Sequence, residues 1–232
     1  MTYSRSENIN NRKSRQTDPA SGCLSGFMIP PLIVLCFGFL LAYAVGNMKG
    51  SSVPDIQPQA VSTSVSGVLA PLFTPEIQFW SADIVRWASE HGIDPNIVAT
   101  VMQIESCGNP DARSSAGASG LFQVMPSHFL PLENAYDPDV NALRGLNYLA
   151  QSLRNSGGDA RLALAGYNGG IGVINRSQSN WAAETIRYAY WGSGIYYDAS
   201  QNANTSQRLN EWLAAGGASL CKKASSRLGI AQ

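Results

Sequence analysis

Hydrophobic residues recur every three to four positions from about residue 74 towards the C-terminus, which is the period of amphipathic α-helices. The first stripe predicts a helix that Thr74 caps, with Pro75 at its first position and Gly92 at its end. Its apolar face would consist of Ile77, Trp80, Ile84 and Trp87.

The same signals predict five further helices. Asp94-Pro95 and Asp137-Pro138 each place a capping carboxylate before a proline, and Asp159 offers a third cap. No stretch shows the sustained alternation of a strand. We therefore predict a mainly α-helical domain over residues 74–232, whose later helices occupy residues 94–105, 137–157, 159–169, 181–191 and 207–215.

The segment before this domain has a different pattern. Residues 27–46 form an apolar run without a charge, and at about 1.5 Å per residue it is long enough to cross a bilayer of about 30 Å. The basic residues Arg5, Arg12, Lys13 and Arg15 precede it, so the positive-inside rule places residues 1–26 in the cytoplasm and the chain after residue 46 outside the cell membrane. A cleaved signal peptide is the alternative, because Ala42-Tyr43-Ala44 resembles a cleavage site. Residues 47–73, rich in Ser, Pro, Gln and Val, read as a flexible linker.

The amino-acid composition excludes some classes of function. Lys+Arg and Asp+Glu both total 16, so the chain has no net charge and lacks the basic character of a nucleic-acid-binding protein. The four cysteines lack zinc-site spacing and the chain has two histidines, so we predict no metal site.

Glu105 is the most informative candidate residue. The stripe of the second helix, Ile97 and Val101, continues by four residues to Glu105, so a carboxyl group occupies a position expected to be apolar. Desolvation raises the pKa of such a group, which suits a general acid near neutral pH. The ordinary alternative is a solvated helical glutamate.

The motifs around Glu105 carry a family resemblance. Glu105-Ser106 is followed by Gly120-Leu121-Phe122-Gln123-Val124-Met125-Pro126, by Ala165-Gly166-Tyr167-Asn168-Gly169-Gly170 and by Glu184-Thr185-x-x-Tyr188. Together these blocks resemble the transglycosylase SLT domain of the lytic murein transglycosylases, which is related to goose-type lysozyme. The resemblance runs from about residue 97 to about residue 190 and implies a lysozyme-like helical fold.

The resemblance assigns roles residue by residue. It makes Glu105 the single catalytic acid. The residues that it places against the glycan substrate are Ser114, Gln123, Met125, Tyr167, Asn168 and Tyr188. Five of them have a structural alternative: Gln123 could satisfy backbone groups, Asn168 could cap a helix, and Met125, Tyr167 and Tyr188 could be packing residues. Two departures are Cys107-Gly108, where the family often has a bulky aromatic residue, and Phe122, where methionine is commoner.

The implied reaction cleaves peptidoglycan without water, between N-acetylmuramic acid (MurNAc) and N-acetylglucosamine (GlcNAc), and leaves 1,6-anhydromuramic ends. Two alternatives stay open. One is a lysozyme-like hydrolase, for which Asp111 is the second carboxylate nearest in sequence. The other is a non-catalytic glycan-binding module of the cell envelope. A protein complex of the envelope would suit this topology, and nothing in the sequence identifies a partner.

Two cysteines fall in the exported domain, Cys107 and Cys221. An oxidising compartment would favour a disulfide between them, which would attach the Gly- and Ser-rich C-terminal tail behind Glu105. Two free thiols are the alternative.

Overall fold

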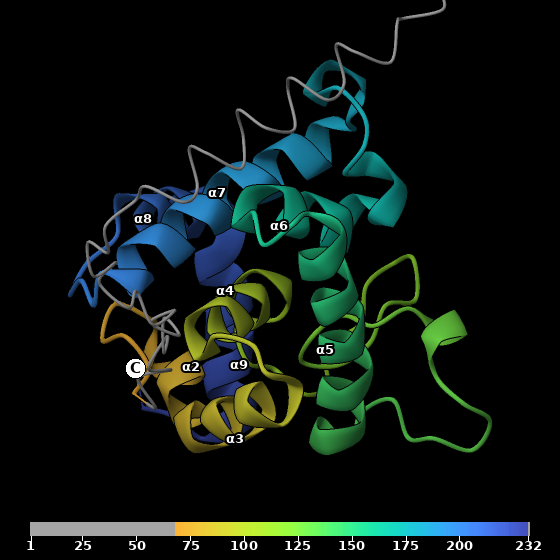
Figure 1. Cartoon of the computed structure of the whole chain (residues 1–232). Helices are drawn as coiled ribbons and strands as arrows, with labels where there is room; N and C mark the ends of the chain where they lie inside the picture. The colour runs from red at the N-terminus through yellow and green to blue at the C-terminus, as the bar shows by residue number, and fades with distance from the viewer. Residues whose placement is uncertain (1–67, 232) are drawn as a thin grey trace, which may run out of the picture. The chain divides into compact units, whose positions relative to one another are not determined.

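A computed structural model describes residues 68–231, and within them the chain is a set of helices joined by loops (Figure 1). The α-helices are α2 (Pro75–Phe79), α3 (Ser81–His91), α4 (Pro95–Glu105), α5 (Pro138–Asn155), α6 (Ala160–Gly169), α7 (Ala183–Ser200), α8 (Gln207–Trp212) and α9 (Ala218–Leu228). Short helical turns are η1 (Pro126–His128), η2 (Ile171–Val173), η3 (Gln178–Asn180) and the π-helical η4 (Leu213–Gly217). Within residues 68–231, β-pairing is confined to two isolated bridges in the loop between α4 and α5. The prediction of a mainly helical domain is confirmed.

Helix α4 lies at the centre of this fold. Every residue from Pro95 to Gln103 is buried, and α4 packs against α2, α3 and α7. Helices α5, α6 and α7 pack in succession beside it (Figure 1). The catalytic candidate Glu105 is the last residue of this central helix, so its backbone is held from several sides.

The caps predicted for these helices are largely present. The side chain of Asp94 accepts a hydrogen bond from the Asn96 N–H, and Asp137 and Asp159 cap α5 and α6 in the same way. Thr74 differs, because its hydroxyl donates to Oε1 of Gln103 (3.2 Å) and makes no capping bond. Pro75 and the left-handed Gly92 take the predicted positions.

The first predicted helix is interrupted at Trp80, where α2 ends and α3 begins. The indole N–H of Trp80 donates to the Gly108 carbonyl (2.8 Å), and its ring stacks on Trp87 with 6.1 Å between centroids. These contacts hold Trp80 buried at the break. The stripe of four hydrophobic residues is buried as predicted, although it is divided between two helices.

The folded part of the chain begins before the predicted boundary at residue 74. Leu69, Ala70, Leu72 and Phe73 are buried in the main hydrophobic core, and the Ala70 N–H donates to Oδ1 of Asn96 (3.0 Å). Residues 68–73 therefore belong to the domain, and the predicted linker 47–73 was too long at its C-terminal end.

The other N-terminal predictions lie outside the described residues. These are the cytoplasmic tail 1–26, the membrane segment 27–46 and the linker up to residue 67. Within residues 68–231, none of the helices combines the length and the apolar character that crossing a membrane requires.

The C-terminal segment, predicted as a tail, is helical. After η4, helix α9 buries Cys221, Ala224 and Ser225, which are spaced three and four residues apart on one face. Gly229 ends the helix with a positive φ of 69°. Helix α7 is likewise longer than predicted and continues to Ser200.

Candidate active site

Glu105 lies where α4 ends and a tightly held loop begins. The next residue, Ser106, is buried; its hydroxyl donates to the Leu121 carbonyl (2.7 Å) and accepts from the Gly108 N–H (3.1 Å). These bonds tie the end of α4 to the loop that carries the Gly-Leu-Phe-Gln motif.

Burial dominates the electrostatics of Glu105. It raises the pKa of the carboxyl group from 4.5 to about 8, because the charged form loses hydration. The Tyr188 hydroxyl favours the anion and lowers this pKa, whereas repulsion from Glu184 raises it. A carboxyl group with a pKa near 8 is largely protonated at neutral pH and can donate a proton.

One cavity of about 300 Å³ brings together the residues around this carboxyl group. It is lined by Ile104, Glu105, Asn168, Glu184, Arg187, Tyr188 and Trp191. Tyr188 is 5% exposed, and its hydroxyl has no fully formed hydrogen bond to any of the described residues. Burial and the charge of Glu105 raise the pKa of this hydroxyl well above 10, so it stays protonated.

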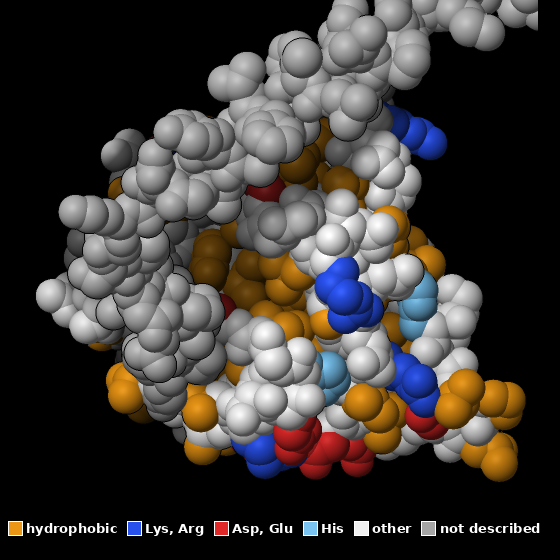
Figure 2. Space-filling view, in the orientation of Figure 1, with side chains coloured by type: hydrophobic (Ala, Val, Ile, Leu, Met, Phe, Trp, Pro, Cys, Tyr) orange, Lys and Arg blue, Asp and Glu red, His pale blue; other side chains and the backbone are white. Residues whose placement is uncertain are grey.

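A second cavity of about 310 Å³ shares Asn168 with the first. Its lining includes Gln123, Met125, His128, Arg144, Tyr148 and Tyr167. The shared residue makes the two cavities neighbours, so together they provide a longer recess with Glu105 in one part. In the view of Figure 2, hydrophobic side chains form the floor of a hollow in the described part of the molecule.

Asn168 is oriented by a neighbour on α7. Its Oδ1 accepts a hydrogen bond from the Thr185 hydroxyl (2.8 Å), and Thr185 is 2% exposed. The bond occupies the amide oxygen and leaves the amide N–H groups of Asn168 as the donors for the cavities. The structure thus places the Tyr-Asn motif and the Glu-Thr-x-x-Tyr motif in direct contact.

An asparagine outside the recognised motifs holds the Gly-Leu-Phe-Gln loop. Asn141 on α5 accepts from the Phe122 N–H (2.8 Å) and donates to the carbonyls of Ser119 (2.8 Å) and Ala135 (2.9 Å). Gly120 has φ +77°, and a Cβ there would lie 2.3 Å from Nδ2 of Asn141. The glycine therefore allows the close approach that fixes this loop.

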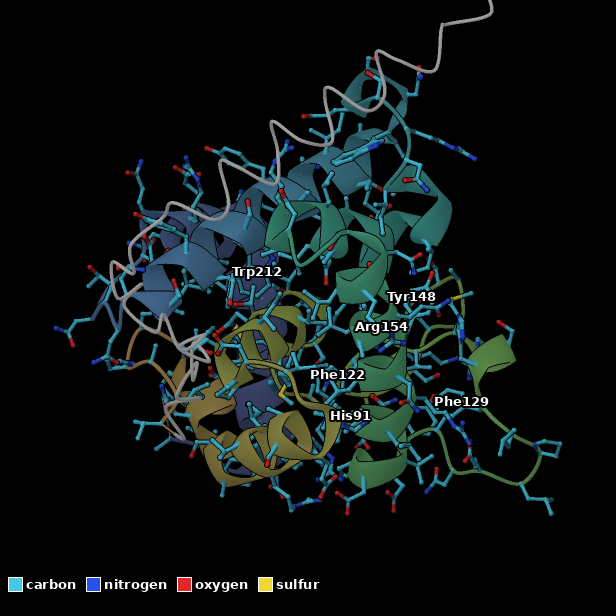
Figure 3. The ribbon with its side chains drawn as sticks, in the orientation of Figure 1. His91, Phe122, Phe129, Tyr148, Arg154 and Trp212 are labelled. Atoms are coloured by element: carbon cyan, nitrogen blue, oxygen red, sulfur yellow. A yellow bond between two sulfur atoms is a disulfide. The ribbon has the colours of Figure 1, made fainter. Side chains whose placement is uncertain are left out.

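Phe122, a departure from the family pattern, fills the core. It is fully buried, packs edge-on against Trp87 and lies against Gly145 of α5 (Figure 3). The other departure, Gly108, leaves room for Trp80: a Cβ on Gly108 would lie 3.1 Å from the indole ring.

Three of the remaining predicted binding residues, Met125, Tyr167 and Gln123, line the second cavity, and Ser114 does not. Met125 is 41% exposed in the second cavity, and Tyr167 lines it while donating to the Phe122 carbonyl (2.8 Å). Gln123 also lines it, but its amide N–H groups donate to the carbonyls of Ala112 (3.1 Å) and Gly120 (3.0 Å).

Ser114 is not among the residues that line either cavity. Its hydroxyl accepts a hydrogen bond from the Ala118 N–H (3.0 Å), which closes the turn that contains it. Its side chain is therefore engaged in the structure of the loop.

Sequence reasoning missed an aromatic row beside the second cavity. Tyr148 of α5 packs edge-on against Tyr167, with ring centroids 5.8 Å apart, and its ring is tilted against that of His128 of η1, with centroids 4.9 Å apart. In Figure 3, Tyr148 lies on the side of α5 that faces the loop carrying η1. Tyr148 and His128 occupy no recognised motif, so neither carried a signal in the sequence.

Cys107 and Cys221 form a disulfide with their Cα atoms 5.0 Å apart. It joins the residue two positions after Glu105 to α9. Gln103 donates to the Cys107 sulfur (3.1 Å), and the buried Glu76 accepts from the Ser225 hydroxyl beside it. Glu76 and these two sulfurs are the one cluster within residues 68–231 with metal-ligand proximity, and the disulfide leaves no thiolate to bind a metal.

Comparisons with known proteins agree with the motifs. The family model described as "Transglycosylase SLT domain" matches residues 83–189. The transglycosylase of Enterobacteria phage PRD1 is 40% identical over 114 residues, which cover 48% of this chain and 40% of the phage protein.

Two further matches are bacterial. The membrane-bound lytic murein transglycosylase C of Edwardsiella ictaluri is 29% identical over 157 residues, covering 56% of this chain and 43% of that protein. A solved structure of the lytic transglycosylase Slt from Pseudomonas aeruginosa is 26% identical, with a TM-score of 0.38, and covers 65% of this chain and 24% of that one. The chain spans less than half the length of these relatives.

Proposed function

Because this chain belongs to the transglycosylase SLT domain family, we propose that it is a lytic transglycosylase that cleaves the glycan strands of peptidoglycan. The observation that carries the proposal is the carboxyl group of Glu105, desolvated at the end of a buried helix and raised in pKa to about 8. At pH 7 about nine-tenths of such a group is protonated, compared with less than about one part in a hundred for an ordinary glutamate.

The first step of the reaction is proton donation. Glu105 protonates the glycosidic oxygen between MurNAc and GlcNAc, and the bond from C1 of MurNAc to that oxygen breaks. The 2-acetamido group of the substrate stabilises the positive charge at C1. The amide N–H groups of Asn168 and the hydroxyl of Tyr188 face the same cavity and are donors for the oxygens of the substrate.

The second step closes a ring. Glu105, now anionic, takes the proton from the C6 hydroxyl of MurNAc while O6 bonds to C1, which gives the 1,6-anhydro product and restores the acid. The nucleophile belongs to the substrate, so it has a large effective-concentration advantage over water. A single carboxyl group serves both steps, and neither step calls for a metal or an organic cofactor.

A hydrolase is the alternative that the site itself suggests. Asp111, the carboxylate first considered for it, is exposed and forms an ion pair with Arg227 of α9. Glu184 lines the same cavity as Glu105 and is the better candidate for positioning a water molecule. A binding-only module is disfavoured, because binding alone does not require a carboxyl group held where its charge is costly.

The products distinguish these alternatives. Purified peptidoglycan digested with the full-length protein should yield muropeptides whose MurNAc ends are one water lighter than reducing ends. Digestion in ¹⁸O-labelled water should incorporate no label. Labelled reducing ends would instead establish hydrolysis.

Substitution of Glu105 tests the site. Glu105→Gln should preserve the fold and lower cleavage about 10²–10⁴-fold, because the amide cannot donate a proton. Asp111→Asn, which alters an exposed carboxylate outside the cavity, is the matched control and should cleave at the parental rate. Cleavage by Glu105→Gln at the parental rate would place the active site elsewhere.

We also propose that residues 27–46 anchor the domain in the cell membrane, with the N-terminus cytoplasmic. The support is the uncharged apolar run with basic residues before it, together with relatives named membrane-bound lytic murein transglycosylases C and E. Protease added outside spheroplasts should release the domain by cutting between residues 47 and 67. A soluble mature chain that begins near Val45 would establish a cleaved signal peptide instead.

A further inference from the structure

A cavity on the outer side of α7 and α8 is larger than either cavity at the candidate active site. Its volume is about 450 Å³, compared with about 300 Å³ for the cavity around Glu105. Its lining comes from the C-terminal part of α7 and the start of α8, and it shares no residue with the Glu105 cavity. It is therefore a separate feature of the surface.

Two tyrosines on α7 dominate this cavity. Tyr190 is 43% exposed and Tyr197 is 66% exposed, so both rings are accessible from the surface. They are seven residues apart, which is two helical turns or about 10.5 Å. Both line the same cavity, so they present two aromatic surfaces in a row.

Arg208 of α8 is fixed between α7 and its own helix. Its guanidinium lies 4.1 Å from the centre of the Tyr190 ring, and its Nη1 donates to both carboxylate oxygens of Glu211 (2.8 Å each). A guanidinium held in this way cannot adopt many rotamers, so little conformational entropy remains to be lost when a ligand binds.

Gly194 makes the position of Arg208 possible. A Cβ on Gly194 would lie 2.2 Å from Cγ of Arg208, so any other residue would push the arginine away from α7. Glycine within a helix is less favourable than alanine, because its backbone loses more conformational freedom on folding. The close approach of Arg208 explains a glycine that helix stability alone disfavours.

The charges around the cavity limit the kind of ligand. Asp198 lines it, and the positive charge of Arg208 is paired with Glu211, so the cavity has no excess positive charge to attract a phosphate or a nucleic acid. Asp198, Gln207 and Arg208 instead offer both donors and acceptors. Aromatic faces combined with such groups suit a neutral ligand with apolar ring faces and many hydroxyls.

From these observations we propose that the α7–α8 cavity binds the saccharide rings of a peptidoglycan glycan strand and holds the enzyme on its polymeric substrate. The identity of the ligand rests on the proposed function. Tyr190 and Tyr197 would stack on the C–H faces of two sugar rings, and their spacing is close to the repeat of a β-1,4-linked disaccharide. Asp198, Gln207 and Arg208 would bind hydroxyl and acetamido groups.

Binding is measured without cleavage. The full-length Glu105→Gln protein is sedimented with purified, protein-free peptidoglycan sacculi, and its Kd is compared with that of the same protein carrying Tyr197→Ala or Tyr190→Ala. Each tyrosine substitution should raise Kd about tenfold, as loss of an aromatic contact commonly does. Tyr197→Phe keeps the ring and should retain the parental Kd.

Phe79→Ala is the matched control, because Phe79 is an exposed aromatic residue (54%) on α2 that lines none of these cavities. It should bind as the parent does. Equal Kd values for the parent and both tyrosine variants would overturn the inference, as would a parent that does not sediment with sacculi. Melting temperatures within about 2 °C of the parent establish that the variants are folded.

Turnover separates this inference from the proposed function. With Glu105 intact, Tyr197→Ala should lose activity on insoluble sacculi and keep parental activity on a short soluble glycan fragment. An equal loss on both substrates would overturn the inference, because the tyrosine would then act on the catalytic site. Absence of cleavage by the parent would refute the proposed function, while the sedimentation experiment would still report on this cavity.

Discussion

Glu105→Gln should make the domain more stable while it lowers the cleavage rate, and the gain in stability should depend on pH. In the folded chain, burial raises the pKa of Glu105 to about 8, against 4.5 for the ordinary group. The folded state therefore favours the protonated carboxyl group more than the unfolded state does. Stability from this group is complete below pH 4.5 and is lost as the pH rises towards 8. Glutamine resembles the neutral acid and does not titrate.

The magnitude follows from the two pKa values. At pH 5 the penalty on the parent is less than about 1 kcal/mol, whereas at pH 7 it is about 3 kcal/mol, since each pKa unit corresponds to 1.36 kcal/mol. For a domain of this size 1 kcal/mol shifts the melting temperature by about 2–4 °C. Glu105→Gln should therefore melt about 6 °C or more above the parent at pH 7 and close to it at pH 5.

Thermal unfolding followed by circular dichroism between pH 5 and pH 8 measures this difference. Glu90→Gln is the matched control, because Glu90 is an exposed helical glutamate whose ion pair with Arg86 lies on the surface. Its melting temperature should stay near the parental value throughout. A Glu105→Gln advantage that is the same at pH 5 and pH 8 would refute the assignment of a desolvated carboxyl group.

Three further predictions concern the site and its support. The value of kcat/KM should fall above about pH 8, because Glu105 ionises there. Glu184→Gln removes a repulsion that raises the pKa of Glu105, so the fall should begin at a lower pH. An unchanged pH profile would show that the charge of Glu184 does not affect Glu105. Reduction of the disulfide, or Cys107→Ser, should lower the free energy of unfolding by up to about 4–5 kcal/mol, because the bond closes a long loop. Denaturant unfolding with and without reductant measures this loss, and unchanged unfolding midpoints would contradict the prediction. Thr185→Val should lower kcat about tenfold, because Asn168 loses the bond that orients it. A parental kcat would show that this bond has no role in catalysis.

Local signals in the sequence predicted the helices well and their breaks less well. Proline after an acidic cap has the same effect in any surroundings, so α4 and α5 begin where predicted. The break at Trp80 depends on the Gly108 carbonyl, which is distant in the sequence. Helix α9 is another example, because its apolar face is small and its helical state depends on burial of Cys221 and on the core that it meets.

The candidate site shows the same division. Glu105 stood out because a carboxyl group continued an apolar stripe, and Tyr188 and Asn168 stood out through motifs; the structure places all three at one cavity. Asn141 and Tyr148 carried no comparable signal. An asparagine and a tyrosine on an amphipathic helix are ordinary in the sequence, and only the packing of α5 shows what they contact.

The sequence by itself therefore determined the features that depend on interactions between residues close together in the chain. These are the helical periodicity, the acidic caps before prolines, and the presence of a carboxyl group suited to acid catalysis. Tertiary structure decided the rest. The raised pKa of Glu105 requires desolvation at a cavity that α4, α6 and α7 line together. The separate α7–α8 cavity requires Arg208 to approach Gly194. Both features depend on which helix surfaces pack against each other after folding. Such contacts join residues that are distant in the sequence, so local patterns of residues do not reveal them.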